Sequence, residues 1–275
     1  MKDFSGKIVY IVGGSSGIGL ATAKALAAEG AHIIIFARRK GHLERAIKEI
    51  HGNKISNSQQ FACRQMDVSN WDEVKAVMSR AVAEFGVPDV LINCAGRAYP
   101  RVFEEVTYEQ FDETMKINFY GIWHTTSALV PYMKQNGGYI VNVSSIGGFI
   151  GLFGYTDYSA SKFAIIGFSE ALRSELKRYG IRVSVLCPPD TNTPGFHEEN
   201  KTKPEETEAI SADAKLRQPE EVAYALLKGM RKEEKYIIPG FDGRVIFLLK
   251  RLFPGLVEFV IDSTIKKVQA KRGEK

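Results

Sequence analysis

Short runs rich in β-branched residues alternate with stretches of helical periodicity along most of this chain, and no other feature constrains its fold as strongly. The runs read as almost continuous apolar strings, which is typical of parallel strands covered by helices on both faces. Strand and helix alternating in one direction imply right-handed βαβ crossovers. We therefore expect an α/β fold with a doubly wound parallel sheet and helices on both of its faces. The expected strands are residues 7–12, 32–36, 90–93, 139–143 and 182–186, and the expected helices are residues 18–29, 41–51, 72–85, 108–134 and 158–179.

The alternation of strands and helices continues without a break that would mark a domain boundary. No internal repeat and no linker rich in Pro, Gly or Ser divides the 275 residues, so we expect a single domain over residues 1–243. Within it, residues 188–217 are polar and irregular, and we expect a mobile flap there over the carboxyl edge of the sheet. Residues 244–275 are expected to form an amphipathic, basic C-terminal extension.

Positive charge is concentrated in this extension. The formal net charge of the chain is +5, and residues 244–272 hold seven basic residues against two acidic ones, so the rest of the chain is neutral. A nucleic-acid-binding protein would spread basic residues over a face of the fold, so we expect no nucleic-acid partner. The basic residues are Arg244, Lys250, Arg251, Lys266, Lys267, Lys271 and Arg272, and the acidic ones are Glu258 and Asp262.

Other classes of protein are excluded by residue types and their placement. The three cysteines are odd in number and widely spaced, and the five histidines are scattered, so we expect neither a disulfide framework nor a metal site. Residues 135–156 lack charged side chains, but they include six glycines and do not resemble a membrane span. The N-terminus runs directly into an apolar strand without a signal-peptide pattern, so we expect a cytoplasmic protein.

A glycine-rich turn follows the first expected strand. Gly13, Gly17 and Gly19 form a G-x-x-x-G-x-G pattern directly before a helix. Glycine lets the backbone turn sharply and approach a pyrophosphate, which the N–H groups at the helix N-terminus then receive. A lone glycine pattern also fits an ordinary β–α turn. Its place in the first βα unit favours a dinucleotide-binding site.

The end of the second expected strand indicates which dinucleotide binds. An NAD-binding chain usually places a carboxylate there for the ribose 2′-OH, whereas this chain has Arg38 and Arg39 and no acid. Guanidinium groups suit a 2′-phosphate because they form charge-assisted, often bidentate, hydrogen bonds with it. The alternative is a pair of solvated surface arginines. Next to the glycine turn, the pair predicts NADPH (or NADP) as the cofactor.

A tyrosine and a lysine open the last expected helix of the sheet region. A spacing of four places Tyr158 and Lys162 on one helix face, one turn apart. A phenol has a pKa of about 10, and a nearby ammonium group favours the phenolate and so lowers that pKa towards the working range. Ser145 follows the strand of residues 139–143 and can donate a hydrogen bond to a substrate oxygen. Alone, Tyr-x-x-x-Lys more often marks a solvent-facing helix pair, but together with the glycine turn it predicts a catalytic site.

These motifs together resemble the short-chain dehydrogenase/reductase family, of the single-domain branch with a Rossmann-type fold, from about Gly6 to Gly240. Further landmarks lie at residues 67–68, 93–96, 144–145 and 188–193, and at Asn118. The resemblance implies that the cofactor is contacted by Gly13, Ser15, Ser16, Gly17, Ile18, Gly19, Arg38, Arg39, Asp67, Val68, Asn93, Ala95, Gly96, Tyr158, Lys162, Pro188, Asp190, Thr191 and Thr193.

The resemblance also implies catalytic roles by position. Tyr158 is the expected proton donor to a carbonyl, and Lys162 binds the nicotinamide ribose and lowers the pKa of Tyr158. Ser145 polarises the substrate carbonyl, and Asn118 holds a water in the proton relay. If the serine register is shifted by one, Ser144 takes the place of Ser145.

This sequence departs from the family pattern at two positions near the cofactor. Val12 stands where the family usually has Thr, and Cys94 stands where it often has a second Asn. Each change removes a side-chain hydrogen bond, but neither removes a catalytic group.

A narrower resemblance concerns the substrate. Residues 187–196, 198–200 and 202–204, together with 152–154 and 161–165, are similar to the 3-ketodihydrosphingosine (3-ketosphinganine) reductases, with Asn192 in place of an expected acid. This resemblance implies NADPH-dependent reduction of 3-ketosphinganine to sphinganine, a step of sphingolipid metabolism. The segment also fits a cofactor-side turn shared with reductases of other hydrophobic ketones, of 3-oxoacyl or steroid type. A non-catalytic, cofactor-sensing scaffold is a third reading, against which Ser145, Tyr158 and Lys162 argue.

The expected partners are a small hydrophobic ketone or sphingoid-base substrate and further copies of this chain, in a dimer or tetramer. Residues 244–265 mix apolar side chains with Lys250 and Arg251, a pattern too interrupted by charge to span a bilayer but suited to its interface. We therefore expect peripheral membrane contact through the extension. The alternatives are a helix that closes the substrate site and a contact between subunits.

Overall fold

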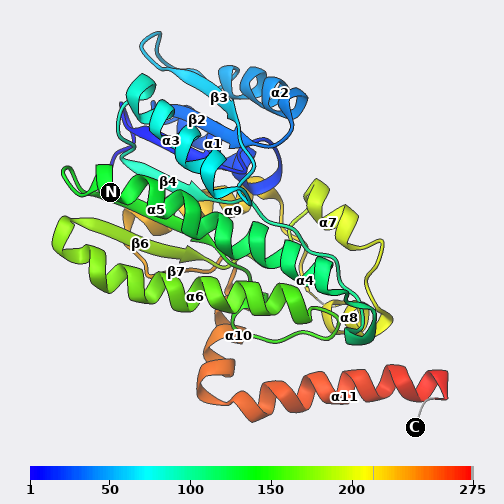
Figure 1. The fold of residues 1–275 in the computed structure, drawn as a ribbon. Coiled ribbons are helices and arrows are strands. Elements are labelled where there is room, and N and C mark those ends of the chain that lie inside the picture. Colours follow the sequence, from blue (N-terminus) through cyan, green and yellow to red (C-terminus); the bar gives the residue numbers. More distant parts are fainter. Residues whose placement is uncertain (213, 274–275) are drawn as a thin grey trace.

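The computed structural model, which describes residues 1–212 and 214–273, contains a seven-stranded, entirely parallel sheet (Figure 1). The strand order is β3-β2-β1-β4-β5-β6-β7, so the chain leaves β1 towards one edge, then returns to pair β4 on the other side of β1. This is the doubly wound arrangement that the sequence predicts. The strands are β1 (Ile8–Val12), β2 (His32–Ala37), β3 (Phe61–Gln65), β4 (Val90–Asn93), β5 (Gly138–Val143), β6 (Ile181–Leu186) and β7 (Tyr236–Ile237).

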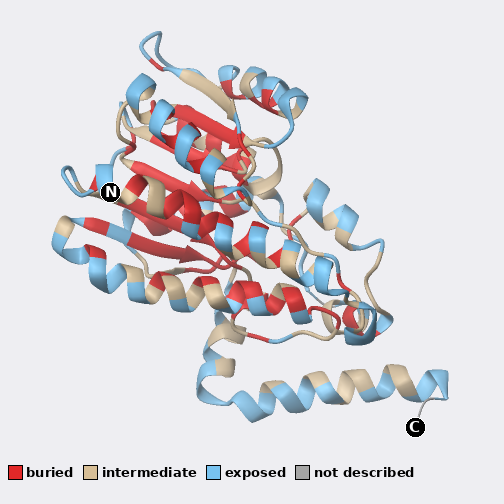
Figure 2. Ribbon diagram, viewed as in Figure 1, coloured by how far each residue is buried: buried red, intermediate tan, exposed pale blue. Residues whose placement is uncertain are grey.

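Helices cover both faces of the sheet, and the central strands are buried as a result (Figure 2). On β1, Val9 and Ile11 pack in one core cluster while Tyr10 and Val12 pack in the other, because successive side chains point to opposite faces. The first cluster includes side chains of α1 (Gly17–Ala27), α2 (Lys40–His51) and α9 (Pro219–Arg231). The second includes side chains of α3 (Trp71–Phe85), α5 (Gly121–Met133) and α6 (Thr156–Leu176).

The five strands expected from the sequence are all present, and two edge strands were not expected. The side chains of β3 are mostly half-buried and include Cys63, Arg64 and Gln65, so the strand lacks the apolar run that marks its neighbours. The strand β7 has two residues, which is too short for any periodicity. Edge strands are exposed on one side and therefore carry a weaker hydrophobic signal.

One expected helix is divided by a turn of π-helix. Residues 108–134 form α4 (Tyr108–Met115), a π-helical turn (Lys116–Tyr120) and α5. Single π turns inside α-helices occur frequently at functional sites. Here the turn contains Asn118, one of the predicted catalytic residues.

The segment expected to be irregular contains two short helices, α7 (Pro194–Glu199) and α8 (Glu205–Ser211). The expectation of an irregular flap was therefore wrong for these residues. Thr193 caps α7, since its Oγ1 accepts a hydrogen bond from the Phe196 N–H at 3.1 Å, and Pro194 occupies the first helical position. Thr207 of α8 donates a hydrogen bond to the Phe153 carbonyl at 2.8 Å, which holds α8 against the loop before α6.

The C-terminal extension consists of α10 (Phe241–Leu252) and α11 (Pro254–Arg272). The boundary expected at residue 243 falls inside α10, which packs on the body through Phe247, 5.1 Å from the Phe149 ring and 5.2 Å from the Tyr236 ring. By contrast, α11 runs outside the body beneath α8 (Figure 1), where Arg272 pairs with Glu205 and Glu206. Among the described residues, no helix is long and apolar enough to cross a membrane.

Candidate active site

The predicted site residues lie along the carboxyl edge of the sheet, where the strand order reverses between β1 and β4. Backbone hydrogen bonds hold the connecting loops in place: Gly13 N–H donates to Phe36 O, Cys94 N–H to Val12 O, and Ser144 N–H to Leu186 O, each at 2.8 Å. In open α/β sheets, ligands bind outside the carboxyl ends of the strands at this reversal point. The fold therefore brings the glycine turn and the Tyr158 region to one ligand-binding edge.

The glycine turn is packed so closely that side chains are excluded from it. A Cβ on Gly13, whose φ is +82°, would lie 2.6 Å from the Ala95 nitrogen, and a Cβ on Gly19 would lie 2.3 Å from the Gly13 oxygen. The first turn of α1 holds no acidic residue, and the Ser16 side chain makes no capping hydrogen bond there. This N-terminus fits a pyrophosphate, because neither Ser16 nor an acidic side chain of the first turn occupies its N–H groups.

Arg38 and Arg39 follow β2 directly, beside the glycine turn. Arg38 and Arg39 are both exposed, Arg39 lies at the N-cap of α2, and neither guanidinium forms an ion pair with any of the described residues. Both are therefore available for a phosphate. Their role in binding a 2′-phosphate remains a prediction.

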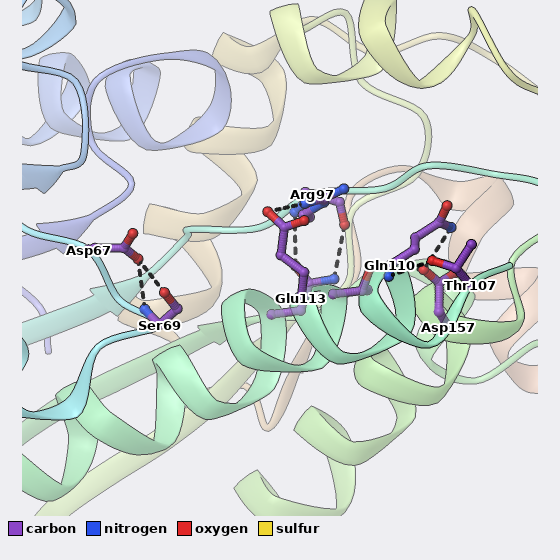
Figure 3. A network of polar contacts seen from close by, with 9 residues as sticks. Asp67, Ser69, Arg97, Thr107, Gln110, Glu113 and Asp157 are labelled. Carbon is purple, nitrogen blue, oxygen red and sulfur yellow. Dashed lines mark hydrogen bonds and ion pairs between the residues drawn. The ribbon is translucent and has the colours of Figure 1, made fainter.

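The residues predicted for the adenine side differ in what their side chains can offer. Asp67 Oδ1 accepts hydrogen bonds from the Ser69 N–H at 2.9 Å and the Ser69 hydroxyl at 2.7 Å (Figure 3). Among the described residues no bond is made to Oδ2, which leaves it for a base amino group. The Val68 carbonyl, in contrast, is already bonded to His124 Nδ1 at 2.7 Å.

The side chain of Asn93 is used inside the protein. Its Oδ1 accepts from the Thr125 hydroxyl at 2.7 Å and its Nδ2 donates to Asn142 Oδ1 at 2.9 Å, and the residue is 1% exposed. Only its backbone is left for a cofactor, so its predicted contact is reduced to a main-chain one. The adjoining Ala95 and Gly96 lie against Gly13 and against Asn118 and Lys162, respectively.

Lys162 is buried beneath Tyr158, as the spacing of four predicts. Its Nζ donates a hydrogen bond to the Val143 carbonyl at 3.0 Å and lies 5.5 Å from the centre of the Tyr158 ring. Burial lowers the pKa of Lys162 to about 8. Within the described chain that is its sole hydrogen bond, so further N–H groups remain for a ribose.

The pKa of Tyr158 departs from the sequence-based expectation. Burial raises it above the usual value, the Glu199 carboxylate raises it further, and a hydrogen bond with Ser145 lowers it. The net shift of the pKa is therefore opposite to the lowering expected from Lys162. The reason is that desolvation of the phenolate outweighs an ammonium group that lies under the ring.

The two adjacent serines have separate tasks. Ser144 is 2% exposed and its hydroxyl donates to the Lys162 carbonyl at 2.9 Å, so it fastens α6 to the end of β5. Ser145 is half-buried, and it is the serine hydrogen-bonded to Tyr158. The geometry therefore favours Ser145 over Ser144 as the serine that meets a substrate oxygen.

Asn118 joins the π-helical turn to the loop after β4. Its Oδ1 accepts from the Arg97 N–H at 2.8 Å, and its Nδ2 donates to the Arg97 carbonyl and to Ser161 Oγ, both at 3.0 Å. Arg97 itself forms an ion pair with Glu113 of α4 (Figure 3). Both side-chain amide hydrogens of Asn118 are therefore already hydrogen-bonded. A water would have to bind to the oxygen atoms of Asn118, and this role remains a prediction.

Asp157 is a positioning residue that the sequence reasoning missed. It is fully buried, its Oδ1 accepts from the Tyr158 N–H at 2.8 Å, and its Oδ2 accepts from Thr114 and Gln110 of α4 at 2.8 and 3.1 Å (Figure 3). These bonds fix the first turn of α6 and with it the Tyr158 side chain. The available signal was an acidic residue in the first turn of a helix, which the helix dipole favours.

The sequence reasoning also missed a contact between Tyr155, which precedes α6, and Glu199 of the flap. The Tyr155 ring lies 5.4 Å from the Tyr158 ring, and its hydroxyl donates to Glu199 Oε1, at the end of α7. Lys203 Nζ lies 4.0 Å from the same oxygen. Residues 44 positions apart form this contact, so no local pattern marks it.

The remaining predicted cofactor contacts lie in the strand-to-flap turn. The Pro188 carbonyl accepts from the Ile146 N–H at 3.2 Å, and the Thr191 hydroxyl donates to the Pro189 carbonyl at 2.7 Å. A Cβ on Gly17 would lie 3.0 Å from Thr193 Cγ2, so this turn packs against the glycine turn. Asp190 is in the same turn, and burial raises the pKa of its carboxyl.

Comparisons with known proteins agree with this geometry. The family model described as short chain dehydrogenase matches residues 7–204. The chain is 44% identical over 226 residues to the 3-dehydrosphinganine reductase of Danio rerio, covering 82% of this chain and 68% of the relative. It is 38% identical over 272 residues to the 3-ketodihydrosphingosine reductase of Dictyostelium discoideum, covering 92% and 80%. The crystal structure of apo LigD from Sphingobium sp. strain SYK-6 superposes with a TM-score of 0.77 at 30% identity, covering 93% of this chain and 98% of that one.

Proposed function

Because this chain belongs to the short-chain dehydrogenase family, we propose that it is an NADPH-dependent reductase that converts 3-ketosphinganine to sphinganine. The observation that carries the proposal is the meeting of Ser145, Tyr158 and Lys162 beside the glycine turn, at the carboxyl edge of the sheet. The substrate is inferred from the relatives, which are reductases of this sphingoid ketone.

The chain's residues perform the reduction in a simple division of roles. Ser145 and Tyr158 hold the ketone oxygen by their hydroxyls, and Tyr158 transfers its proton to that oxygen as the carbonyl becomes a secondary alcohol. When bound, NADPH supplies the hydride that reaches the carbonyl carbon. Lys162 holds the ribose and lies under the Tyr158 ring, where it stabilises the phenolate left after proton transfer.

The protonation state of Tyr158 is compatible with reduction. An ordinary phenol is already protonated at neutral pH, and burial and Glu199 raise the pKa of Tyr158 further, so the hydroxyl holds the proton it would donate. The same shift makes the phenol a weaker acid, which gives Lys162 the task of stabilising the phenolate as the proton leaves.

Product analysis tests the function. Purified protein with 3-ketosphinganine and NADPH should give sphinganine, with one NADPH consumed for each molecule formed. Reduction of a 3-oxoacyl thioester or a steroid ketone, with 3-ketosphinganine left intact, would favour the alternative substrates. Binding of NADPH without turnover of any ketone would favour the non-catalytic scaffold.

We also propose that the protein is a homo-oligomer, a dimer or a tetramer, that assembles through aromatic side chains on α4, the π-helical turn, α5 and α6. These side chains are exposed in the single chain: Tyr108, Phe111, Tyr120, Trp123 and Phe163. Exposed aromatic residues gathered on neighbouring helices are typical of protein interfaces. Light scattering should give a mass of two or four chains, and a monomer mass would contradict the proposal.

The third part of the proposal is a cytoplasmic protein that attaches peripherally to membranes through its C-terminal helices. At the junction of α10 and α11, large apolar side chains are exposed: Leu248, Leu252, Phe253, Leu256, Phe259 and Val260. Basic residues Lys250, Arg251, Lys266, Lys267 and Lys271 belong to the same two helices. Apolar side chains enter the acyl boundary, while each basic residue near anionic lipid adds on the order of 1 kcal/mol.

We expect the protein to co-sediment with vesicles that contain anionic phosphatidylserine, and less so as salt concentration rises. The chain cut after Leu252 should lose this binding and reduce the long-chain ketone more slowly than before, with unchanged activity on a short soluble ketone. A cut after Gly243 would also remove Phe247 from its contacts with Phe149 and Tyr236, so it cannot separate the two effects. Equal loss on both ketones after the cut at Leu252 would contradict the membrane role.

A further inference from the structure

We propose that Glu199 binds the ammonium group on the carbon next to the substrate ketone, and so makes the enzyme selective for 2-amino ketones. This inference rests on the proposed function and adds a specificity-determining residue to it. Glu199 ends α7 in the flap and is far in sequence from the catalytic helix that it contacts.

The contacts of Glu199 place it beside the reacting groups and leave one of its oxygens unused. The Tyr155 hydroxyl donates to Oε1, and the Tyr155 ring lies 5.4 Å from the ring of Tyr158. Lys203 Nζ is 4.0 Å from Oε1 as well. Within the described part of the chain, Oε2 has no hydrogen-bond donor, although the Glu199 side chain is only 18% exposed.

The charges around Glu199 favour the arrival of a further cation. Burial raises the pKa of Glu199 and of its neighbour Asp190, and Lys203 lowers both without offsetting the burial. Lys162 also faces Glu199, but its Nζ is turned to the Val143 carbonyl. Burial of a carboxylate is unfavourable unless opposite charges and hydrogen bonds compensate for its desolvation. An ammonium group beside Oε2 would offset the desolvation of Glu199.

The chemistry of the substrate supplies this cation at the required place. In 3-ketosphinganine the ammonium nitrogen is on the carbon adjacent to the ketone, two bonds from the carbonyl carbon. A ketone oxygen held by Ser145 and Tyr158 therefore places the ammonium group near the Tyr158 phenol, where Tyr155 and Glu199 lie. Simple 3-oxoacyl and steroid ketones have no cation there and would leave Oε2 of Glu199 without a partner, which selects against them.

The test compares two ketones on matched variants. The ketones are 3-ketosphinganine and its 2-deamino analogue, which has hydrogen in place of the amine. Glu199→Gln keeps an acceptor for the Tyr155 hydroxyl and removes the charge. Its control is Glu198→Gln, because Glu198 is the adjacent glutamate, is 61% exposed and pairs with Lys201 at the surface.

We expect Glu199→Gln to lower kcat/KM for 3-ketosphinganine roughly 10- to 100-fold, mainly through KM, because a hydrogen bond to a charged group is lost. The deamino analogue should be reduced as well as or better than before, and Glu198→Gln should change neither value. NADPH affinity and the thermal midpoint should be those of the unaltered protein. Glu199→Asp, which keeps the charge, should retain most of the preference for the amino ketone.

An equal loss on both ketones would overturn the inference and make Glu199 a residue that only holds the flap to α6. If Glu199→Gln does not fold, the same comparison on Glu199→Asp decides, with roughly a two- to tenfold loss expected for the amino ketone alone. If the unaltered protein reduces neither ketone, the proposed function fails and the inference fails with it. If the unaltered protein reduces both ketones equally well, the function stands and the inference is wrong.

Discussion

Replacement of Tyr158 by Phe should lower kcat by about a hundredfold or more, which is the scale of general acid catalysis, and should leave NADPH affinity intact. The change removes the transferable proton and retains the ring that lies over Lys162. An ordinary phenol is protonated at neutral pH and the pKa of Tyr158 is raised further, so its hydroxyl holds the proton to be donated, whereas the Gly147 N–H that is bonded to Ser145 cannot supply one. Steady-state kinetics with the ketone and a fluorescence titration with NADPH check both parts.

The same measurements on two further variants serve as a negative control and as a test of the neighbouring lysine. Tyr224→Phe removes an exposed hydroxyl on α9, away from this edge, and should change nothing. Lys162→Ala should impair both turnover and NADPH affinity, because the lysine serves the ribose and the phenolate. Near-normal turnover in Tyr158→Phe would mean that another acid protonates the ketone, and the assigned catalytic site would be wrong.

The double replacement Arg38→Ala with Arg39→Ala should raise KM for NADPH steeply while KM for NADH barely moves. Each guanidinium offers a charge-assisted hydrogen bond to the 2′-phosphate, and its loss should raise KM for NADPH roughly 10- to 100-fold per arginine. The structure leaves both guanidiniums without an ion-pair partner among the described residues, so their removal breaks no internal contact. The ratio of kcat/KM for the two cofactors is the quantity to measure.

A matched control for this pair is Lys177→Ala with Arg178→Ala. These are also adjacent, exposed basic residues, but they precede β6 at the opposite edge of the sheet. Their loss should change neither cofactor constant, which separates a local contact with phosphate from a general effect of net charge. Equal changes for NADPH and NADH in the Arg38/Arg39 variant would contradict the assignment of the cofactor.

The parts of the fold that could be predicted are those with a local signal. The five central strands are continuous β-branched runs because both of their faces are buried, and the structure confirms each of them to within a residue at either end. The strands β3 and β7 lie at the edges of the sheet and were missed, since their half-buried or very short sequences carry little pattern. The two helices of the flap were missed for a similar reason, as each has only six or seven residues.

The candidate site likewise has residues that could be predicted from local spacing and residues that could not. Tyr158 and Lys162 are one helical turn apart, and the glycine turn is continuous in sequence, so the backbone geometry of each follows from local spacing. Whether Ser144 or Ser145 meets the phenol could not be read from the chain. It depends on which of the two hydroxyls is occupied by the Lys162 carbonyl, a contact between separate elements.

The sequence by itself determined the order of the five central strands and of the helices between them, the glycine turn and the tyrosine–lysine pair, because these depend on contacts between near neighbours in the chain. The tertiary structure alone decided that Asp157 anchors the catalytic helix to α4, and that Glu199 reaches Tyr155 across 44 residues. It also decided the direction of the Tyr158 pKa shift. A pKa depends on how completely water is excluded and on which charges lie near in space, and both arise only when distant segments pack together.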